Sequence, residues 1–376
     1  MSDPVRPQGL APRHAVRSAP PSPIGTPAQP AAGSLATRYR RFARRRLWWI
    51  GALLLALLAS VLIDVSLGPS NLPLADVARA LWFSDQVDQS RRVIVWEVRL
   101  PFAIMAVLVG ASLGLAGAEM QTALNNPLAS PMTLGLAAAA AVGASLAVIL
   151  GWTWMLAGEN LAVPLAAFAG AAVATLLIQA LSWRHGASVE TVVLFGIALL
   201  FTFEALLWLM QYMADANALQ QIVFWSMGSL TRTTWNKITI VALVLLACAL
   251  WSARDTWALT TMRSGDDQAR SLGLSVERVR LLTLLRVSLV AATALSFVGT
   301  IGFVGLVGPH IARLLLGEDQ RFMLPGAALA GALMLSAASI LSKSLVPGVV
   351  LPIGIITALV GVPMFMALIW RARRLP

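Results

Sequence analysis

The segment from Arg263 to Arg280 reads RSGDDQARSLGLSVERVR and lies between two long apolar runs. Residues 265–273 predict a short helix that ends at Gly273, because glycine is favoured just after a helix C-terminus. Ser275 is typical of an N-cap and predicts a second short helix over 275–280. Two such helices at right angles would form a compact knob that a bound protein could push as a rigid body. The plainer interpretation is an ordinary solvated loop.

The sequence around this segment is apolar, which indicates a membrane protein. Of the 376 residues, 58% are hydrophobic and only 12% are charged, whereas soluble domains carry about 25% charged residues. Runs of about 20 apolar residues can cross a bilayer, and helices satisfy their own backbone hydrogen bonds there. We therefore predict an all-α polytopic protein with about ten spans, placed at residues 47–67, 101–123, 132–151, 161–183, 190–213, 236–252, 281–301, 302–316, 323–345 and 350–370.

Basic residues predict the orientation of these spans. Residues 1–46 contain nine arginines and one aspartate, and three more arginines follow residue 370. Because cytoplasmic flanks are rich in Lys and Arg, we expect both termini and the 263–280 segment in the cytoplasm. These clusters abut spans, which favours contact with anionic lipid over nucleic acid. Eight prolines in residues 1–34 predict a disordered tail, so we divide the chain into a tail, 1–46, and a transmembrane domain, 47–372.

The sequence lacks the signatures of an enzyme. No HExxH, GxSxG or GxxxxGK[ST] motif occurs, and there are only three histidines. The single cysteine, Cys248, excludes an intrachain disulfide and a thiolate metal cluster. We therefore expect no catalytic residue, no bound metal and no cofactor. Any dependence on ATP would come from a separate partner subunit.

Several polar or small residues interrupt the spans. Residues 119–131 read EMQTALNNPLASP, a polar turn broken by proline, which is either a tight connection or a gate at the inner mouth of a pathway. Glu204 lies inside a predicted span, where an acid is a functional candidate. Gly110, Gly114 and Gly117 predict close helix approach. Glycines in residues 299–308 predict an irregular stretch at membrane depth.

Taken together, these motifs resemble the permease subunits of ATP-binding-cassette importers for iron–siderophores, haem and vitamin B12, which are the type II importers of the FecCD type. The resemblance covers about residues 47–372. It rests on RLP at 99–101, Gln121 with NPLASP at 126–131, WSMGSL at 225–230, ARSLG at 269–273, GFVGLVGPH at 302–310, LPG at 324–326, LPIG at 351–354 and GVPMF at 361–365.

The resemblance implies ten helices per subunit and a dimer of permeases with the pathway along its axis. Two ATPase subunits would bind on the cytoplasmic side, and a periplasmic substrate-binding protein would deliver the ligand. The residues implied in ATPase coupling are Gly265, Asp266, Ala269, Arg270, Leu272, Gly273, Arg278 and Arg280. Those implied in the pathway or its gates are Gln121, Asn125, Asn126, Pro127, Glu204, Ser226 and Met227.

For docking of the binding protein, the resemblance implies Arg99 and Lys343. The family often has a second basic residue just after the RLP motif, where this chain has Phe102, and Arg91 or Arg92 could substitute for it. The expected function is ATP-driven uptake of a chelated metal, foremost an Fe(III)–siderophore, across a bacterial inner membrane.

Haem and vitamin B12 remain alternative ligands, and an ion-coupled secondary transporter is the alternative class. Such carriers are typified by inverted repeats and ion sites at the membrane midplane. To test the knob, we expect that charge reversal at Arg278 and Arg280 together abolishes uptake without lowering the amount of folded protein.

Overall fold

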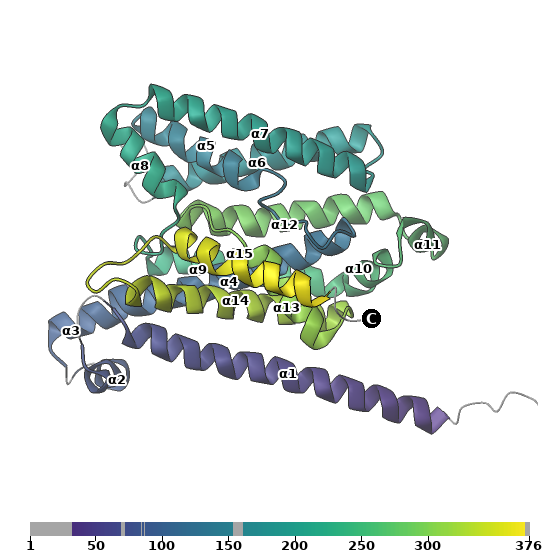
Figure 1. Ribbon diagram of the computed structural model, residues 1–376, viewed down its shortest axis with the longest axis horizontal. Helices are drawn as coiled ribbons and strands as arrows, with labels where there is room; N and C mark the ends of the chain where they lie inside the picture. Colours follow the sequence, from purple (N-terminus) through teal and green to yellow (C-terminus); the bar gives the residue numbers. More distant parts are fainter. Residues whose placement is uncertain (1–31, 69–71, 84, 86, 153–160, 373–376) are drawn as a thin grey trace, which may run out of the picture. The chain divides into compact units, whose positions relative to one another are not determined.

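The computed structural model describes residues 32–68, 72–83, 85, 87–152 and 161–372. Every regular element within these ranges is a helix (Figure 1). Seven helices are long and apolar enough to cross a membrane, and three shorter apolar helices match the remaining predicted spans. The prediction of an all-α polytopic protein with about ten transmembrane helices is therefore confirmed.

The helices that match the predicted spans begin and end within a few residues of the predicted bounds, except that α1 begins well before residue 47. They are α1 (Ala32–Ser66), α4 (Leu100–Ala123), α5 (Leu136–Ile149), α6 (Ala162–Arg184), α7 (Val189–Met213), α9 (Trp235–Arg254), α12 (Val276–Val298), α13 (Val304–Leu316), α14 (Gln320–Ser344) and α15 (Ile353–Ala372). The connecting helices are α2 (Leu74–Trp82), α3 (Gln89–Val93), the π-helix η2 (Ile94–Arg99), α8 (Ala216–Ser226), α10 (Thr256–Met262) and α11 (Asp266–Ser271).

The predicted disordered tail, 1–46, needs a correction. The chain divides into two compact units, residues 1–44 and residues 45–376. Residues 1–31 lie outside the described residues, but residues 32–46 are helical because α1 begins at Ala32. The reason is local composition: the last proline of the tail is Pro30, and the residues after it are mostly good helix formers such as Ala, Leu and Arg.

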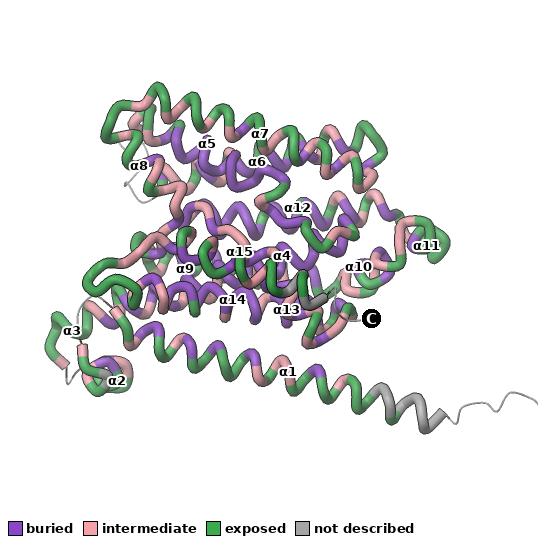
Figure 2. Tube along the Cα trace, viewed as in Figure 1, coloured by how far each residue is buried: buried purple, intermediate pink, exposed green. Residues whose placement is uncertain are grey.

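In the second unit, α4 and α12 form the centre. Buried residues make up 72% of the apolar stretch in each of these helices, against 17% in α7 (Figure 2). Close packing depends on glycine, as the sequence predicts. A Cβ atom on Gly114 would lie 2.2 Å from the Ala327 carbonyl oxygen of α14, and one on Gly117 would lie 1.9 Å from the Gly305 carbonyl oxygen of α13. Only glycine allows these backbones to approach so closely.

The short helices lie at two opposite ends of the second unit. Helices α10 and α11 lie at one end, which we call the α11 end, and α2, α3 and α8 lie at the other, the α8 end (Figure 1). Helix α2 follows α1, and α8 follows α7. Residues 299–303 are non-helical between α12 and α13, which confirms the first half of the predicted irregular stretch, whereas residues 304–308 belong to α13.

Candidate functional site

The predicted knob at the α11 end is present in part. Gly265, with a φ of +100°, precedes α11, and Gly273, with a φ of +86°, follows it. The Gly273 N–H donates to the Arg270 carbonyl and the Leu274 N–H donates to the Ala269 carbonyl, so the helix ends in a glycine-dependent cap as predicted.

The second short helix of the prediction is wrong. Residues 276–280 are the first turn of α12, which continues to Val298 because no glycine or proline interrupts it. A further short helix, α10, comes before α11. Met262, Ala269 and Val276 form a small buried cluster that holds α10, α11 and the start of α12 together.

Arg280 joins this knob to two other segments. Its side chain is 1% exposed, and its Nη2 donates to the Asp266 carboxylate of α11 at 2.7 Å. Its Nε donates to the Ala123 carbonyl at the end of α4 at 2.9 Å, and its Nη1 donates to the Ala187 carbonyl in the loop before α7 at 2.7 Å. Arg280 therefore fixes the knob to both segments from inside the protein, and its implied role in ATPase coupling stays a prediction.

The exposed face of the knob comes from other residues. Leu272 is 58% exposed, and Arg278 and Arg270 are exposed as well. Arg270 Nη2 donates to Glu277 Oε1 at 2.6 Å, and this hydrogen bond raises the pKa of the Arg270 guanidinium above its ordinary value. A partner protein that contacts the knob would therefore meet an apolar side chain flanked by charge.

The predicted gate turn follows α4 directly, beside the Arg280 contact. Asn125 is exposed with a positive φ of 41°, and Pro127 is exposed. Asn126 Oδ1 accepts a hydrogen bond from the Leu128 N–H at 2.9 Å, which fixes the turn. The turn therefore presents Asn125 and Pro127 outward while the backbone behind it is tied to Arg280.

Gln121 differs from the rest of the predicted pathway set. It is 1% exposed, accepts a hydrogen bond from Arg313 Nη2 at 2.9 Å, and donates from Nε2 to the Gly305 carbonyl at 3.4 Å. The side chain thus connects α4 to α13 inside the subunit. Its implied role in the pathway or its gates stays a prediction.

Three residues that the sequence reasoning missed form a buried ion cluster toward the α11 end. Arg286 Nε donates to Glu119 Oε2 at 2.8 Å, and Arg286 Nη1 donates to Asp255 Oδ2 at 2.6 Å. Glu119 also accepts from the Ser252 hydroxyl. The cluster joins α4, α12 and the α9–α10 junction. Arg286 is a charged residue inside a predicted span, and this alone could have identified it from the sequence as a candidate.

A second buried ion pair lies between α1 and α14, and the sequence analysis named only its lysine. Asp64 is fully buried, and its Oδ1 lies 2.8 Å from Lys343 Nζ. The Ser339 hydroxyl also donates to Asp64. The Lys343 side chain is only 4% exposed, so its charge is neutralised inside the subunit. The docking role implied for Lys343 stays a prediction.

Arg99, the other residue implied in docking, also has little exposure. It is 3% exposed, and its Nη1 donates to the Ser66 carbonyl at 2.8 Å. Arg91 and Arg92, the substitutes named from the sequence, have side chains 47% and 54% exposed at the α8 end. They pair there with Asp76 at 2.5 Å and Asp85 at 3.9 Å.

The remaining predicted pathway residues lie away from the gate turn. Glu204 lies half-buried on α7 and forms no hydrogen bond or ion pair with the rest of the described chain. Ser226 and Met227, at the end of α8, are tied to neighbouring segments: Thr300 Oγ1 donates to the Ser226 carbonyl, and the Gly354 N–H donates to the Met227 carbonyl. The structure thus separates the predicted pathway set into three places.

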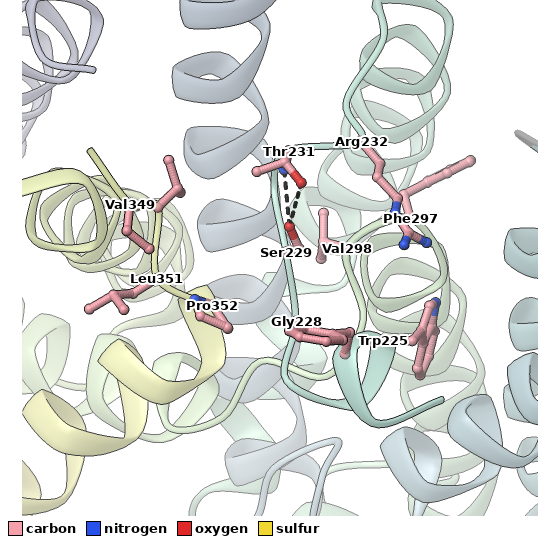
Figure 3. Close-up of a pocket in the computed structure, with 12 residues that line it drawn as sticks. Trp225, Gly228, Ser229, Thr231, Arg232, Phe297, Val298, Val349, Leu351 and Pro352 are labelled. Carbon is pink, nitrogen blue, oxygen red and sulfur yellow. Dashed lines mark hydrogen bonds between the residues drawn. The ribbon is translucent and has the colours of Figure 1, made fainter. Parts of the chain in front are cut away.

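A pocket of about 350 Å³ lies at the α8 end, next to Ser226 and Met227 (Figure 3). Its walls come from the end of α8, the segment after it, the end of α12 and the loop before α15. Phe224, Trp225 and Phe297 give it aromatic walls, and Arg232 is its only charged residue. The arrangement can hold a small anionic or aromatic group, although it contains no set of residues for covalent chemistry.

The helix order and the glycine-dependent core define a multi-span helical membrane subunit, and comparison with known proteins specifies its class. The vitamin B12 import system permease protein BtuC of Serratia proteamaculans is 38% identical over 300 residues, which cover 78% of this chain and 87% of the relative. The hemin transport system permease protein HmuU of Yersinia pestis is 32% identical over 323 residues, covering 85% and 96% of the two chains.

A solved structure of a metal-chelate type ABC transporter in an inward-facing conformation is also similar. It superposes with a TM-score of 0.75 and 29% identity, covering 86% of this chain and 98% of that chain. The model of the FecCD transport family matches residues 55–371, and the chain belongs to this family. It is therefore an ABC transporter permease with the type II importer fold, a transport subunit whose ATP hydrolysis is carried out by a separate subunit.

Proposed function

We propose that this permease imports Fe(III)–siderophores across the inner membrane of a bacterial cell. Its membership of the FecCD transport family and its likeness to a metal-chelate type transporter support a chelated metal as the cargo. The arginines that flank α1 and α15 support an orientation in which the termini and the α11 end face the cytoplasm. The α8 end would then face the periplasm.

The observation that supports the proposed coupling to ATP hydrolysis is the position of Arg280. ATPase subunits that bind the exposed face of α11 would move the knob when they close on ATP. Because Arg280 bonds to Asp266, Ala123 and Ala187 at once, movement of the knob would pull on the end of α4 and on the loop before α7. This linkage would convert ATPase closure into movement of the gate turn at Asn125–Pro127.

Two further subunits complete the proposed importer. A second permease, identical or homologous, would form the pathway with this chain, and Glu204 and the end of α8 are the candidates to face it. A periplasmic binding protein would dock at the α8 end, where Arg91 and Arg92 are the exposed basic residues of α3. The pathway itself should bind its cargo weakly, because a tight site would retain the ligand.

Uptake measurements test this function. Proteoliposomes that contain the permease and its ATPase subunits, with binding protein outside, should accumulate a ⁵⁵Fe-labelled siderophore only when ATP is present inside. Haem and cobalamin, the cargoes named for the two similar permeases, are the comparison ligands. Accumulation of haem or cobalamin but no siderophore would refute the proposed cargo, and uptake without any ATPase would refute the proposed mechanism.

The knob needs a test that avoids Arg280, because reversing a buried and triply bonded arginine would unfold its surroundings. Leu272→Glu changes an exposed residue of the knob. It should weaken ATPase binding to the detergent-solubilised permease and leave the amount of folded protein unchanged. The matched control is Val93→Glu, which changes an exposed residue of α3 at the α8 end. Equal ATPase binding by wild type and Leu272→Glu would remove the knob from the mechanism.

A further inference from the structure

The pocket at the α8 end has walls that the chain holds in place by its own backbone. The Ser229 N–H donates to the Val298 carbonyl at 2.7 Å, which joins the segment after α8 to the end of α12. The Ile353 N–H donates to the Gly228 carbonyl at 3.1 Å, which joins the same segment to the start of α15. The pocket is therefore preformed, as is usual for sites that take small molecules.

The polar groups of the pocket differ in whether they already have a hydrogen-bond partner within the chain. The hydroxyls of Ser229 and Thr231 lie 2.8 Å apart and bond to each other, and the Thr231 N–H donates to Ser229 Oγ at 3.2 Å (Figure 3). These groups already have partners. Arg232 is exposed, and within the described chain its guanidinium has no hydrogen bond or ion pair.

A second cation strengthens the positive charge at this place. Lys237, in the first turn of α9, is 4% exposed and donates from Nζ to the Arg232 carbonyl at 2.7 Å. No described carboxylate lies within salt-bridge distance of Lys237 or Arg232, and no carboxylate lines the pocket. Two neighbouring cations without an acid, beside low-dielectric walls, produce a positive potential that attracts an anion.

The walls of the pocket indicate which kind of anion it can bind. Phe224, Trp225 and Phe297 supply apolar and aromatic surface, and Figure 3 places the Arg232 side chain on the same side of the pocket as Trp225 and Phe297. A guanidinium binds paired oxygen atoms with two parallel hydrogen bonds, and aromatic rings pack against a flat ring. At about 350 Å³ the pocket is near the lower limit for a small-molecule site, so it can take one arm of a chelate but not a whole siderophore.

We propose that this pocket is a binding subsite for an anionic catecholate arm of the metal chelate, and that Arg232 makes the permease prefer negatively charged chelates over neutral ones. The inference rests on the proposed function, since it presumes a chelated-metal cargo. It adds to the proposed function that the cargo is anionic and carries an aromatic ring. It also assigns Arg232 as the residue that selects for the negative charge.

Binding to the purified permease in nanodiscs tests the subsite without the binding protein or the ATPase. The probes are a hexadentate Fe(III) tris-catecholate, which is trianionic, and an Fe(III) tris-hydroxamate of similar size, which is neutral. By equilibrium dialysis with ⁵⁵Fe, wild type should bind the catecholate complex more tightly. Arg232→Gln should weaken catecholate binding about tenfold, the loss expected from one charged hydrogen-bonding group, and leave hydroxamate binding unchanged.

Two control variants separate the subsite from general surface charge. Arg232→Lys keeps the charge and should recover part of the lost affinity, whereas Arg79→Gln removes an exposed cation of α2 outside the pocket and should change nothing. Equal loss of both chelates in Arg232→Gln, or no loss of either, would overturn the subsite. ATP-driven siderophore uptake without charge preference would leave the proposed function standing alone, and chelate binding without ATP-driven uptake would leave only the subsite.

Discussion

Basic residues toward the α11 end and basic residues at the pocket of the α8 end are used in opposite ways. Toward the α11 end, the arginines with little exposure are paired with carboxylates, as Arg280 is with Asp266 and Arg286 is with Glu119 and Asp255. At the pocket of the α8 end, Arg232 and Lys237 have no described carboxylate within salt-bridge distance. The difference indicates that the first group holds helices of the permease together, whereas Arg232 in the second group remains available to a ligand.

The largest expected effect comes from breaking the buried ion cluster. Arg286→Met leaves the Glu119 carboxylate buried without its main partner. Removing one member of a buried pair costs about 3–5 kcal/mol, so folded permease should be largely lost, as measured by size-exclusion chromatography after membrane extraction. Arg278→Met, an exposed arginine on the same helix, is the control and should give wild-type yield. Normal yield of Arg286→Met would mean that the cluster does not hold the helices together.

Two lysines with little exposure, Lys343 and Lys237, allow a paired and an unpaired cation to be compared directly. Lys343→Met leaves Asp64 fully buried and unpaired, so it should destabilise the protein by about 3–5 kcal/mol in denaturant unfolding. Lys237→Met removes a buried cation that leaves no described carboxylate behind. The Lys237→Met variant loses one hydrogen bond, which costs about 1 kcal/mol, but it also no longer buries a charge. These two effects offset each other, so the stability of this variant should stay close to that of wild type. Equal destabilisation by the two variants would contradict the assignment of Lys237 as an unpaired cation.

The fold was largely predictable from the sequence, but the side-chain pairing was not. Apolar runs located the spans because lipid requires helices about 20 residues long. Gly273 located the end of α11 because a left-handed residue is needed there. The second short helix of the knob was wrong because Ser275 marks where a helix begins and says nothing about where it ends.

The contacts of the predicted site residues could not be read from the sequence. The resemblance implied docking for Arg99 and Lys343, a pathway or gate role for Gln121 and ATPase coupling for Arg280, and in the structure the side chains of all four have little exposure. Their partners lie far along the chain: Asp64 for Lys343, and Ala123 and Ala187 for Arg280. Spacing along one segment cannot reveal such contacts. Charges inside predicted spans, such as Arg286 and Lys237, were the available signal.

The smallest expected effect is at the exposed pair of the knob. Arg270→Gln removes the hydrogen bond to Glu277 that raises the pKa of the Arg270 guanidinium. Because the guanidinium remains protonated at every ordinary pH, and because exposed ion pairs contribute little, the melting temperature should stay unchanged between pH 6 and pH 9. A drop in melting temperature as large as that of Arg286→Met would show that the exposed Arg270 pair contributes as much to stability as the buried Arg286 cluster. Exposure would then not predict which ion pairs stabilise the protein.

Site-specific crosslinking tests the central claim, that partner ATPases drive this permease through the α11 knob. The chain has one cysteine, Cys248, which is buried, so a Cys248→Ala background allows a single new cysteine to be placed. In that background, Leu272→Cys should crosslink to the ATPase subunit of the assembled transporter, and Val93→Cys, at the α8 end, should not. An ATPase crosslink from the Val93→Cys position, with none from the Leu272→Cys position, would contradict the account.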